Sequence, residues 1–222
     1  MKKVFIVGAS RGIGLEFVRQ HCDAGDAVTA TARNAEGLAR IQALGATALR
    51  LDLLDAAGAA GLAQQIDGAA FDFTVLNAGV YGPLSAGLQT PTADEFDAVM
   101  HTNVLGAMRV LPQLVGALAP GAKLAVISSR MGSIGLRTAS AGWLYRASKA
   151  ALNSVLKDAS LALAGKAVCV AFHPGWVRTD MGGAGADLEV TQSVSDMRRT
   201  LAALKVADNG SFFNHDGTLL AW

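Results

Sequence analysis

The chain has 222 residues, a length that one α/β domain can fill. Hydrophobic residues make up 51% of it and the formal net charge is +1, which argues against a disordered chain and leaves no surplus charge for binding nucleic acid or an anionic membrane. The two cysteines, Cys22 and Cys169, are far apart and predict neither a disulfide framework nor a zinc cluster.

The first residues enter an apolar run without the features of a secretory signal, so we expect a cytoplasmic protein. Residues 104–127 form the most apolar long segment, but charged, glycine and proline residues interrupt it: Arg109, Pro112, Pro120, Gly121 and Lys123. These interruptions argue against a membrane span.

Short apolar runs alternate with longer segments of helical spacing along the chain. The runs predict six buried parallel strands: KVFIV (3–7), DAVTATAR (26–33), ATALRLD (46–52), FDFTVLNAG (71–79), AKLAVISS (122–129) and KAVCVAFHPG (166–175). Between them we expect helices over residues 12–24, 35–44, 55–67, 92–118 and 142–164. The alternation predicts a doubly wound, mostly parallel sheet with helices on both faces, a three-layer αβα Rossmann fold. No linker or repeat marks a boundary, so one domain over residues 1–222 is predicted.

A glycine-rich loop follows the first strand and opens the first helix in VGASRGIG (7–14). Its glycines would let the backbone approach a pyrophosphate at the positive end of the helix, although a simple chain reversal would also use them. The loop residues predicted to bind a dinucleotide are Gly8, Ser10, Arg11, Gly12, Ile13 and Gly14.

Two more strand ends carry candidate cofactor residues. Asp52 could accept a hydrogen bond from an adenine amino group, with Leu53 beside it, or could cap the next helix. Asn77, Ala78 and Gly79 follow the fourth strand at the edge where open α/β sheets bind ligands, although these three residues could also form a plain turn.

The second strand ends without the carboxylate that an NAD-selective site uses to bind the ribose 2′-hydroxyl. Arg33 at this strand end, and Arg11 in the glycine loop, could instead pair with a 2′-phosphate. The sequence therefore predicts NADP(H) in preference to NAD(H). The alternative is that both arginines are simply solvated.

Candidate catalytic groups come from three segments. Tyr145 and Lys149 are four residues apart in a helical segment and share one face, an arrangement that also occurs by chance on solvated helices. Ser128 and Ser129 end the fifth strand, where a hydroxyl can bond a substrate carbonyl oxygen or form a turn. Asn103 stands in the middle of a predicted helix, where it is either functional or a satisfied core amide.

These strings together resemble the short-chain dehydrogenase/reductase family over nearly the whole chain, and within it the small branch of sniffer-type carbonyl reductases and C-factor-like proteins. The motifs that carry the resemblance are VGASRGIG (7–14), Asp52, NAG (77–79), HTNVLG (101–106), ISSRMGS (127–133), YRASK (145–149) and HPGWVRT (173–179).

The resemblance implies a role for each catalytic candidate. Tyr145 would be the general acid/base, Lys149 would lower its pKa and bind the nicotinamide ribose, and Ser129 would polarise the carbonyl. Asn103 would hold a water of a proton relay. After Pro174 and Gly175, the backbone of Val177 and the side chain of Thr179 would bind the carboxamide.

The sequence thus predicts an oxidoreductase that transfers a hydride between NADP(H) and a small-molecule carbonyl or alcohol. A nucleotide-binding signalling or sensor protein is the alternative, although the complete set of catalytic candidates favours an enzyme. The resemblance is compatible with a homodimer or a monomer. The four histidines show no metal-like clustering, so no metal is predicted.

Overall fold

The apolar runs form the strands of one parallel sheet in the computed structural model, which describes residues 1–222. The strands are β1 (Lys3–Val7), β2 (Ala27–Ala32), β3 (Thr47–Arg50), β4 (Phe71–Leu76), β5 (Leu118–Ile127), β6 (Ala167–His173) and β7 (Ser211–Asn214). Their order is β3-β2-β1-β4-β5-β6-β7 and every neighbouring pair is parallel. The six predicted strands and the Rossmann topology are confirmed.

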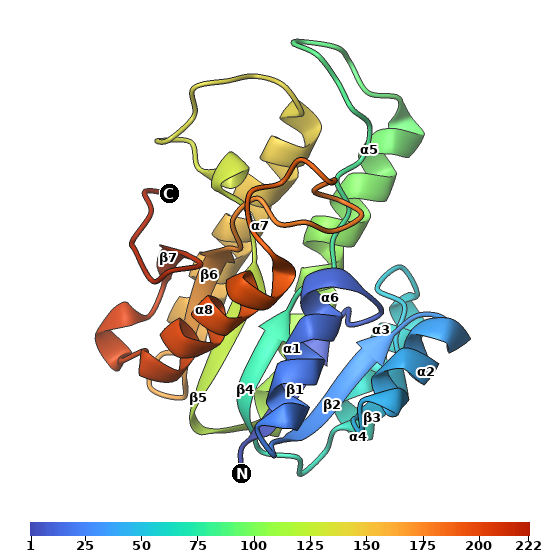
Figure 1. Cartoon of the computed structure of the whole chain (residues 1–222), viewed down its shortest axis with the longest axis vertical. Coiled ribbons are helices and arrows are strands. Elements are labelled where there is room, and N and C mark those ends of the chain that lie inside the picture. Colours follow the sequence, from blue (N-terminus) through green and yellow to red (C-terminus); the bar gives the residue numbers. More distant parts are fainter.

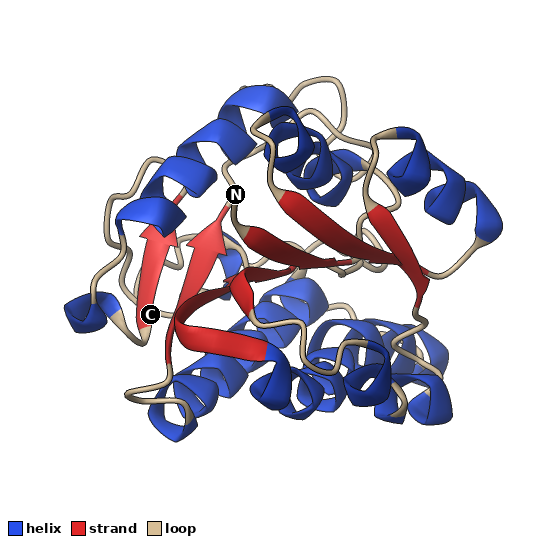
Figure 2. Ribbon diagram, turned by 90° about the horizontal axis from the view of Figure 1, so that it is seen from below, coloured by secondary structure: helices blue, strands red, loops and turns tan.

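Helices cover both faces of the sheet (Figures 1 and 2). One layer holds α1 (Gly12–Asp23), α2 (Ala35–Ala43) and α8 (Val190–Ala203). The opposite layer holds α3 (Ala56–Ala60), α4 (Leu62–Gln65), α6 (Gly106–Leu114) and α7 (Trp143–Ala162). The helix α5 (Ala93–Met100) lies beyond the carboxyl ends of the strands (Figure 1).

The core has two halves because successive side chains of a strand point to opposite faces. In β1, Phe5 and Val7 join the cluster under α6 and α7, whereas Val4 and Ile6 join the cluster under α1 and α8. All four side chains are buried, as expected for a central parallel strand.

The segment between β4 and β5 is more irregular than the single helix predicted over residues 92–118. Thr92 and Glu95 form a capping box at the start of α5, and a π-helical turn at His101–Leu105 separates α5 from α6. A short 3₁₀ turn, Val115–Ala117, then leads into β5, which begins before the predicted strand.

Two other helices also differ from the prediction. The helix expected over residues 55–67 is divided into α3 and α4 at Gly61, which is the C-cap of the first and the N-cap of the second. The helix α8 was not predicted because its sequence is mostly polar. Its buried residues Val194, Met197 and Leu201 nevertheless recur at helical spacing.

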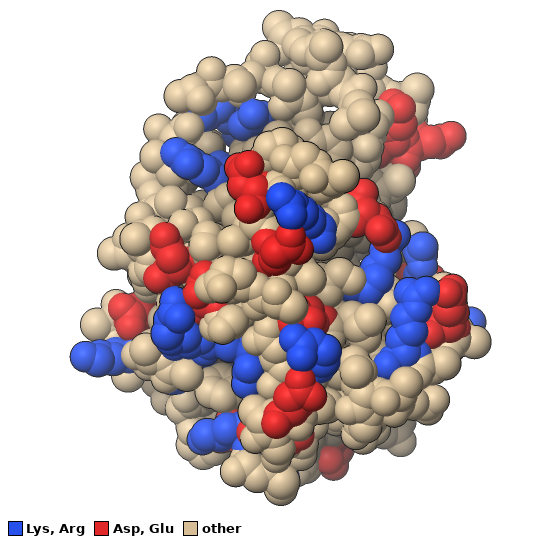
Figure 3. All heavy atoms as spheres, viewed as in Figure 1, with Lys and Arg blue, Asp and Glu red and all other residues tan.

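The carboxyl ends of β1 and β4 lie side by side, and the chain leaves these two neighbouring strands towards opposite faces of the sheet. Ligands of open α/β sheets bind at such a switch point. Acidic and basic side chains are interspersed over the face seen in Figure 3, without a continuous patch of one sign. None of the helices combines the length and apolar character needed to cross a bilayer.

Candidate functional site

The glycine loop packs directly against the end of β4. A Cβ atom on Gly8, which has a φ of +84°, would lie 2.6 Å from Ala78 Cβ, and one on Gly14 would lie 2.2 Å from the Gly8 carbonyl oxygen. The Asn77 side chain donates a hydrogen bond of 2.7 Å to the same carbonyl. The NAG motif after β4 therefore supports the glycine loop, and the loop tolerates no side chain at Gly8 or Gly14.

The loop leads into a helix end that is open to an anion. Arg11 is the N-cap of α1, no side chain caps the helix and no acidic residue lies in its first turn. Its free backbone N–H groups and positive dipole end suit a phosphate. Thr179, from the segment after β6, lies across from the loop, because a Cβ on Gly12 would be 3.4 Å from Thr179 Cγ2.

Three arginines surround the loop, of which the sequence predicted two. Arg33 is exposed at the end of β2 and makes no ion pair. Arg11 instead pairs with Asp180 at 2.5 Å, linking the glycine loop to the segment after β6. The third, Arg40 of α2, donates a hydrogen bond of 3.1 Å to the Ser10 carbonyl oxygen. Sequence reasoning missed Arg40 because only the packing of α2 brings it to the loop.

Asp52 follows β3 without capping a helix. Its carboxylate accepts a hydrogen bond from the Leu54 backbone at 3.0 Å, whereas Asp55 caps α3 by accepting one from Ala57. The helix-cap alternative for Asp52 was therefore wrong, because the helix begins later.

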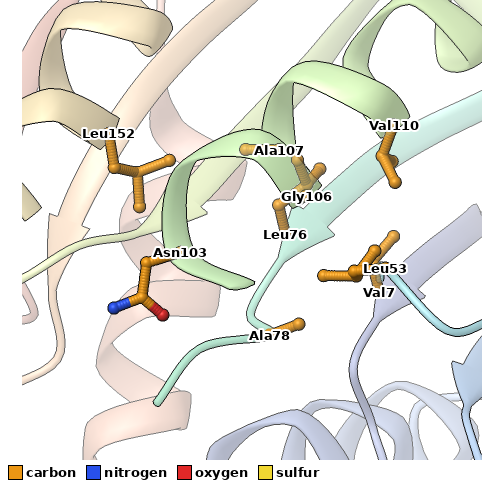
Figure 4. Close-up of a pocket in the computed structure, with 9 residues that line it drawn as sticks. All are labelled: Val7, Leu53, Leu76, Ala78, Asn103, Gly106, Ala107, Val110 and Leu152. Carbon is orange, nitrogen blue, oxygen red and sulfur yellow. The ribbon is translucent and has the colours of Figure 1, made fainter. Parts of the chain in front are cut away.

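Leu53 lies beside a small internal cavity between the sheet and α6 (Figure 4). Nine residues line it: Val7, Leu53, Leu76, Ala78, Asn103, Gly106, Ala107, Val110 and Leu152. Its volume of about 10 Å³ leaves room for one water and excludes a cofactor or substrate.

A much larger cavity of about 480 Å³ opens at the carboxyl edge of the sheet. It brings together predicted residues from four parts of the chain: Ile13, Ser129, Tyr145, Pro174, Gly175, Val177 and Thr179. A site of this size fits a small organic molecule.

Tyr145 lies in the first turn of α7 and is buried, with 7% of its surface exposed. Burial raises the pKa of Tyr145 to about 12, although a hydrogen bond with the Ser129 hydroxyl acts in the opposite direction. The phenol therefore stays protonated over the whole ordinary pH range and can donate a proton.

Lys149 lies one helical turn after Tyr145 and is also buried. Burial lowers the pKa of Lys149 to about 8. Its ammonium group donates a hydrogen bond of 2.9 Å to the Ile127 carbonyl oxygen and lies over the Tyr145 ring, 5.7 Å from the ring centroid. Burial is the largest influence on the Tyr145 pKa, and the lowering of that pKa by Lys149 stays a prediction.

The two serines at the end of β5 face different partners. The Ser128 hydroxyl donates a hydrogen bond of 2.5 Å to the Asn153 side chain of α7. The Ser129 hydroxyl accepts one from the Met131 backbone at 3.1 Å and bonds the Tyr145 hydroxyl. Both serines line the large cavity, and Ser129 is the one whose hydroxyl bonds the Tyr145 hydroxyl.

Asn103 is fully buried in the π-helical turn. Its side-chain oxygen accepts a hydrogen bond from Val80 N, and its amide nitrogen donates to Val80 O and to the Ser148 hydroxyl, each at 2.8 or 2.9 Å. Asn103 thereby ties the loop after β4 to α7. A Cβ on Gly79 would lie 3.2 Å from Asn103 Oδ1 and 3.3 Å from Lys149 Nζ, so a larger residue would press on both groups.

The segment after β6 is held by local contacts. The Pro174 carbonyl accepts a hydrogen bond of 2.5 Å from Ser193 of α8, and Val177 forms a bridge with Leu188. The Thr179 hydroxyl accepts a hydrogen bond from Gly182 N at 3.2 Å. The unpredicted helix α8 therefore supports the segment that carries the predicted carboxamide-binding residues.

Tyr81 was missed by sequence reasoning. Its ring stacks on that of Tyr145, with centroids 4.5 Å apart, and it lines the large cavity. Its position two residues after the NAG motif is the only local signal, because its contact depends on how the loop after β4 meets α7.

A family model described as short chain dehydrogenase matches residues 2–187. C-signal of Myxococcus xanthus is 38% identical over 154 residues, which cover 68% of this chain and 92% of that protein. A putative short-chain dehydrogenase/reductase from Burkholderia multivorans with bound NADP has a TM-score of 0.91, 30% identity and coverage of 100% of this chain and 99% of that one. The carbonyl reductase Sniffer of D. melanogaster has a TM-score of 0.89 and 31% identity, and both chains are covered completely. The chain therefore belongs to the short-chain dehydrogenase family.

Proposed function

We propose that this oxidoreductase reduces the carbonyl group of a small molecule with NADPH and that Tyr145 donates the proton. The observation that carries the proposal is the meeting of two hydroxyls, from Ser129 and Tyr145, in a cavity that also reaches the glycine loop at Ile13. A proton donor and a second hydrogen-bond donor beside a dinucleotide loop are what carbonyl reduction requires.

The residues at the sheet edge fit a dinucleotide. The glycine loop has no side chain at Gly8, Gly12 or Gly14, and the N-terminus of α1 offers uncapped N–H groups to a pyrophosphate. On this basis Ser10 and Ile13 would contact the phosphates, and Asp52, Leu53 and Ala78 would border the adenosine half. Val177 and Thr179 would border the nicotinamide half.

Arg33 supports a preference for NADP(H). Its guanidinium is exposed at the end of β2 with no carboxylate beside it in the sequence, so it is free to bind a 2′-phosphate with charge-assisted hydrogen bonds. Arg11 would have to exchange its Asp180 partner for the phosphate to take part. The NADP bound to the Burkholderia multivorans protein agrees with this preference.

When bound, the reduced nicotinamide supplies the hydride that adds to the carbonyl carbon. Ser129 and Tyr145 would bind the carbonyl oxygen, and Tyr145 would transfer its proton to that oxygen as negative charge develops. The positive charge of Lys149 would then stabilise the phenolate that remains on Tyr145. Asn103 would position Tyr145 through Ser148, whose hydroxyl donates a hydrogen bond of 2.8 Å to the Tyr145 carbonyl oxygen. We also propose that Asn103 holds the water of the predicted proton relay.

A signalling or sensor role is the second candidate, because C-signal of Myxococcus xanthus is 38% identical to this chain. The two candidates differ in whether turnover accompanies nucleotide binding. Tyr145, Ser129, Lys149 and Asn103 are all retained here, which favours catalysis.

Two linked experiments test the proposal. A fluorescence titration of the purified protein with NADPH and NADH should give tighter binding of NADPH. A panel of aldehydes and ketones should then include compounds that oxidise NADPH in the presence of the protein. Binding without any turnover would support the sensor role, and the absence of nucleotide binding would refute both.

A further inference from the structure

The charged side chains along the large cavity are arginines. Arg130 and Arg146 both line it, and no aspartate or glutamate does. Each directly follows a proposed catalytic residue in the sequence, Arg130 after Ser129 and Arg146 after Tyr145. The wall around the two hydroxyls is therefore positively charged on two sides.

Arg146 is half-buried in α7 and held at its base. Its Nε donates a hydrogen bond of 2.8 Å to the Ala141 carbonyl oxygen, and this is the one side-chain hydrogen bond that it makes. The two terminal nitrogens of the guanidinium therefore remain available. A guanidinium fixed in this way loses little conformational freedom when it binds a carboxylate.

Arg130 begins the short 3₁₀ turn after β5 and makes neither an ion pair nor a side-chain hydrogen bond. Arg130 and His173 both line the cavity, and the charge of Arg130 adds to the effects of burial and of His215, which lower the pKa of His173 to about 4. Five other arginines of the chain are paired with carboxylates: Arg11, Arg19, Arg40, Arg178 and Arg199. Neither cavity arginine has such a partner.

The rest of the cavity offers apolar and aromatic surface. Tyr81, Met131, Leu136, Trp176 and Met181 line it. The Trp176 indole is 55% exposed yet fixed by a hydrogen bond of 2.9 Å from its nitrogen to the Gly182 carbonyl oxygen. Apolar and aromatic side chains around a cavity suit an apolar ligand.

We infer that the substrate is a carbonyl compound with an apolar body and a carboxylate group, which Arg130 and Arg146 bind while the carbonyl meets Ser129 and Tyr145. This substrate class rests on the proposed carbonyl reduction. A carboxylate accepts paired hydrogen bonds from a guanidinium, and the two arginines would compensate its charge inside the cavity. A neutral compound of the same shape would leave the positive charge of the two arginines without a partner.

The test compares 4-formylbenzoate with its methyl ester, which share the same aldehyde and differ in the negative charge. We expect wild-type kcat/KM to be at least about 10-fold higher for the acid than for the ester, the effect of one charge-assisted interaction. The acid-to-ester ratio should fall to about one in R130A/R146A. Arg146→Lys, which keeps the charge but loses the planar fork, should retain part of the preference.

Arg137→Ala is the matched control, because Arg137 is an exposed arginine between Arg130 and Arg146 in the sequence that does not line the cavity. It should leave the acid-to-ester ratio unchanged. An acid that is no better than the ester, or a preference that persists in R130A/R146A, would overturn the inference.

Calorimetric titration of both compounds into the protein without cofactor separates this inference from the proposed reaction. Tighter binding of the acid that disappears in R130A/R146A supports the anion site even if neither compound is reduced, in which case only the proposed reaction fails. Equal binding of acid and ester overturns the anion site, whatever the turnover.

Discussion

The ring of Tyr81 lies against the ring of Tyr145, with centroids 4.5 Å apart and planes 25° from parallel. Lys149 lies over the Tyr145 ring at 5.7 Å from its centroid. The Tyr145 phenol is thereby positioned by an aromatic ring from the loop after β4 and by a cation from α7, its own helix.

This contact predicts a role for Tyr81 in positioning the proton donor. Tyr81→Ala removes the stacked ring and admits water to the cavity, so we expect kcat/KM to fall by about 10-fold or more. Tyr81→Phe keeps the ring and should retain activity within about 3-fold. Steady-state kinetics with any active carbonyl measure both, and equal activity of the two variants would contradict the stacking role.

The glycine loop predicts a steric effect on cofactor binding. In Gly14→Ala, the new Cβ would lie 2.2 Å from the Gly8 carbonyl oxygen, so the glycine loop must shift away from its place at the N-terminus of α1. We expect loss of NADPH binding and a fall in the free energy of unfolding of about 1–3 kcal/mol. Gly116→Ala is the control, because its Cβ would meet nothing within 4 Å. Titration and urea unfolding measure both effects, and normal NADPH binding by Gly14→Ala would refute this view of the loop.

Arg33 predicts how the protein distinguishes the two cofactors. Arg33→Ala should weaken NADPH binding by about 10- to 100-fold, the effect of a lost charge-assisted interaction with phosphate, and leave NADH binding unchanged. Arg33→Lys should give an intermediate affinity because a lysine lacks the fork geometry. A uniform loss of affinity for both cofactors would indicate a structural role instead.

The buried Lys149 predicts the pH dependence of the reaction. Its pKa of about 8 means that the ammonium is charged below this pH and neutral above it. We expect kcat/KM for reduction to be constant near neutrality and to fall above about pH 8, as the charge that stabilises the phenolate is lost. Tyr145, with a pKa of about 12, stays protonated throughout and adds no decrease of its own. A kcat/KM that rises through this range would contradict the assignment.

Acid should also destabilise the fold through His173. Burial lowers the pKa of His173 to about 4, whereas an unfolded histidine titrates near about 6.5. Between these values the unfolded state binds more protons, so the free energy of unfolding falls as the pH decreases from about 6.5 to about 4. His173→Leu should flatten this decrease in urea unfolding curves. An unchanged slope would show that other groups cause it.

The sequence predicted those features that depend on the pattern of neighbouring residues. Short apolar runs predicted six strands because a strand buried on both faces is apolar along most of its length. Tyr145 and Lys149 were placed on one helix face because positions four residues apart lie side by side. The doubly wound sheet was predicted because strands and helices alternate along the chain.

The remaining features depend on contacts between distant segments. The Ile127 carbonyl that binds Lys149, the Tyr81 ring and the Arg40 contact with the glycine loop all join residues from different elements. The helix α8 was missed because its sequence is mostly polar and it packs through only a narrow apolar stripe. Asn103 was noticed as unusual in a helix, but its π-helical turn and its bonds to Val80 were beyond local reasoning.

The most direct test of the central claim is the rate of NADPH oxidation by Tyr145→Phe and by wild type, with a carbonyl that the wild type reduces and with NADPH at saturation. The substitution removes only the hydroxyl, so the stacked ring and the contact with Lys149 remain. We predict that NADPH still binds with an affinity close to that of the wild type while turnover falls by about 100-fold or more. Turnover close to that of the wild type would contradict the claim that Tyr145 donates the proton.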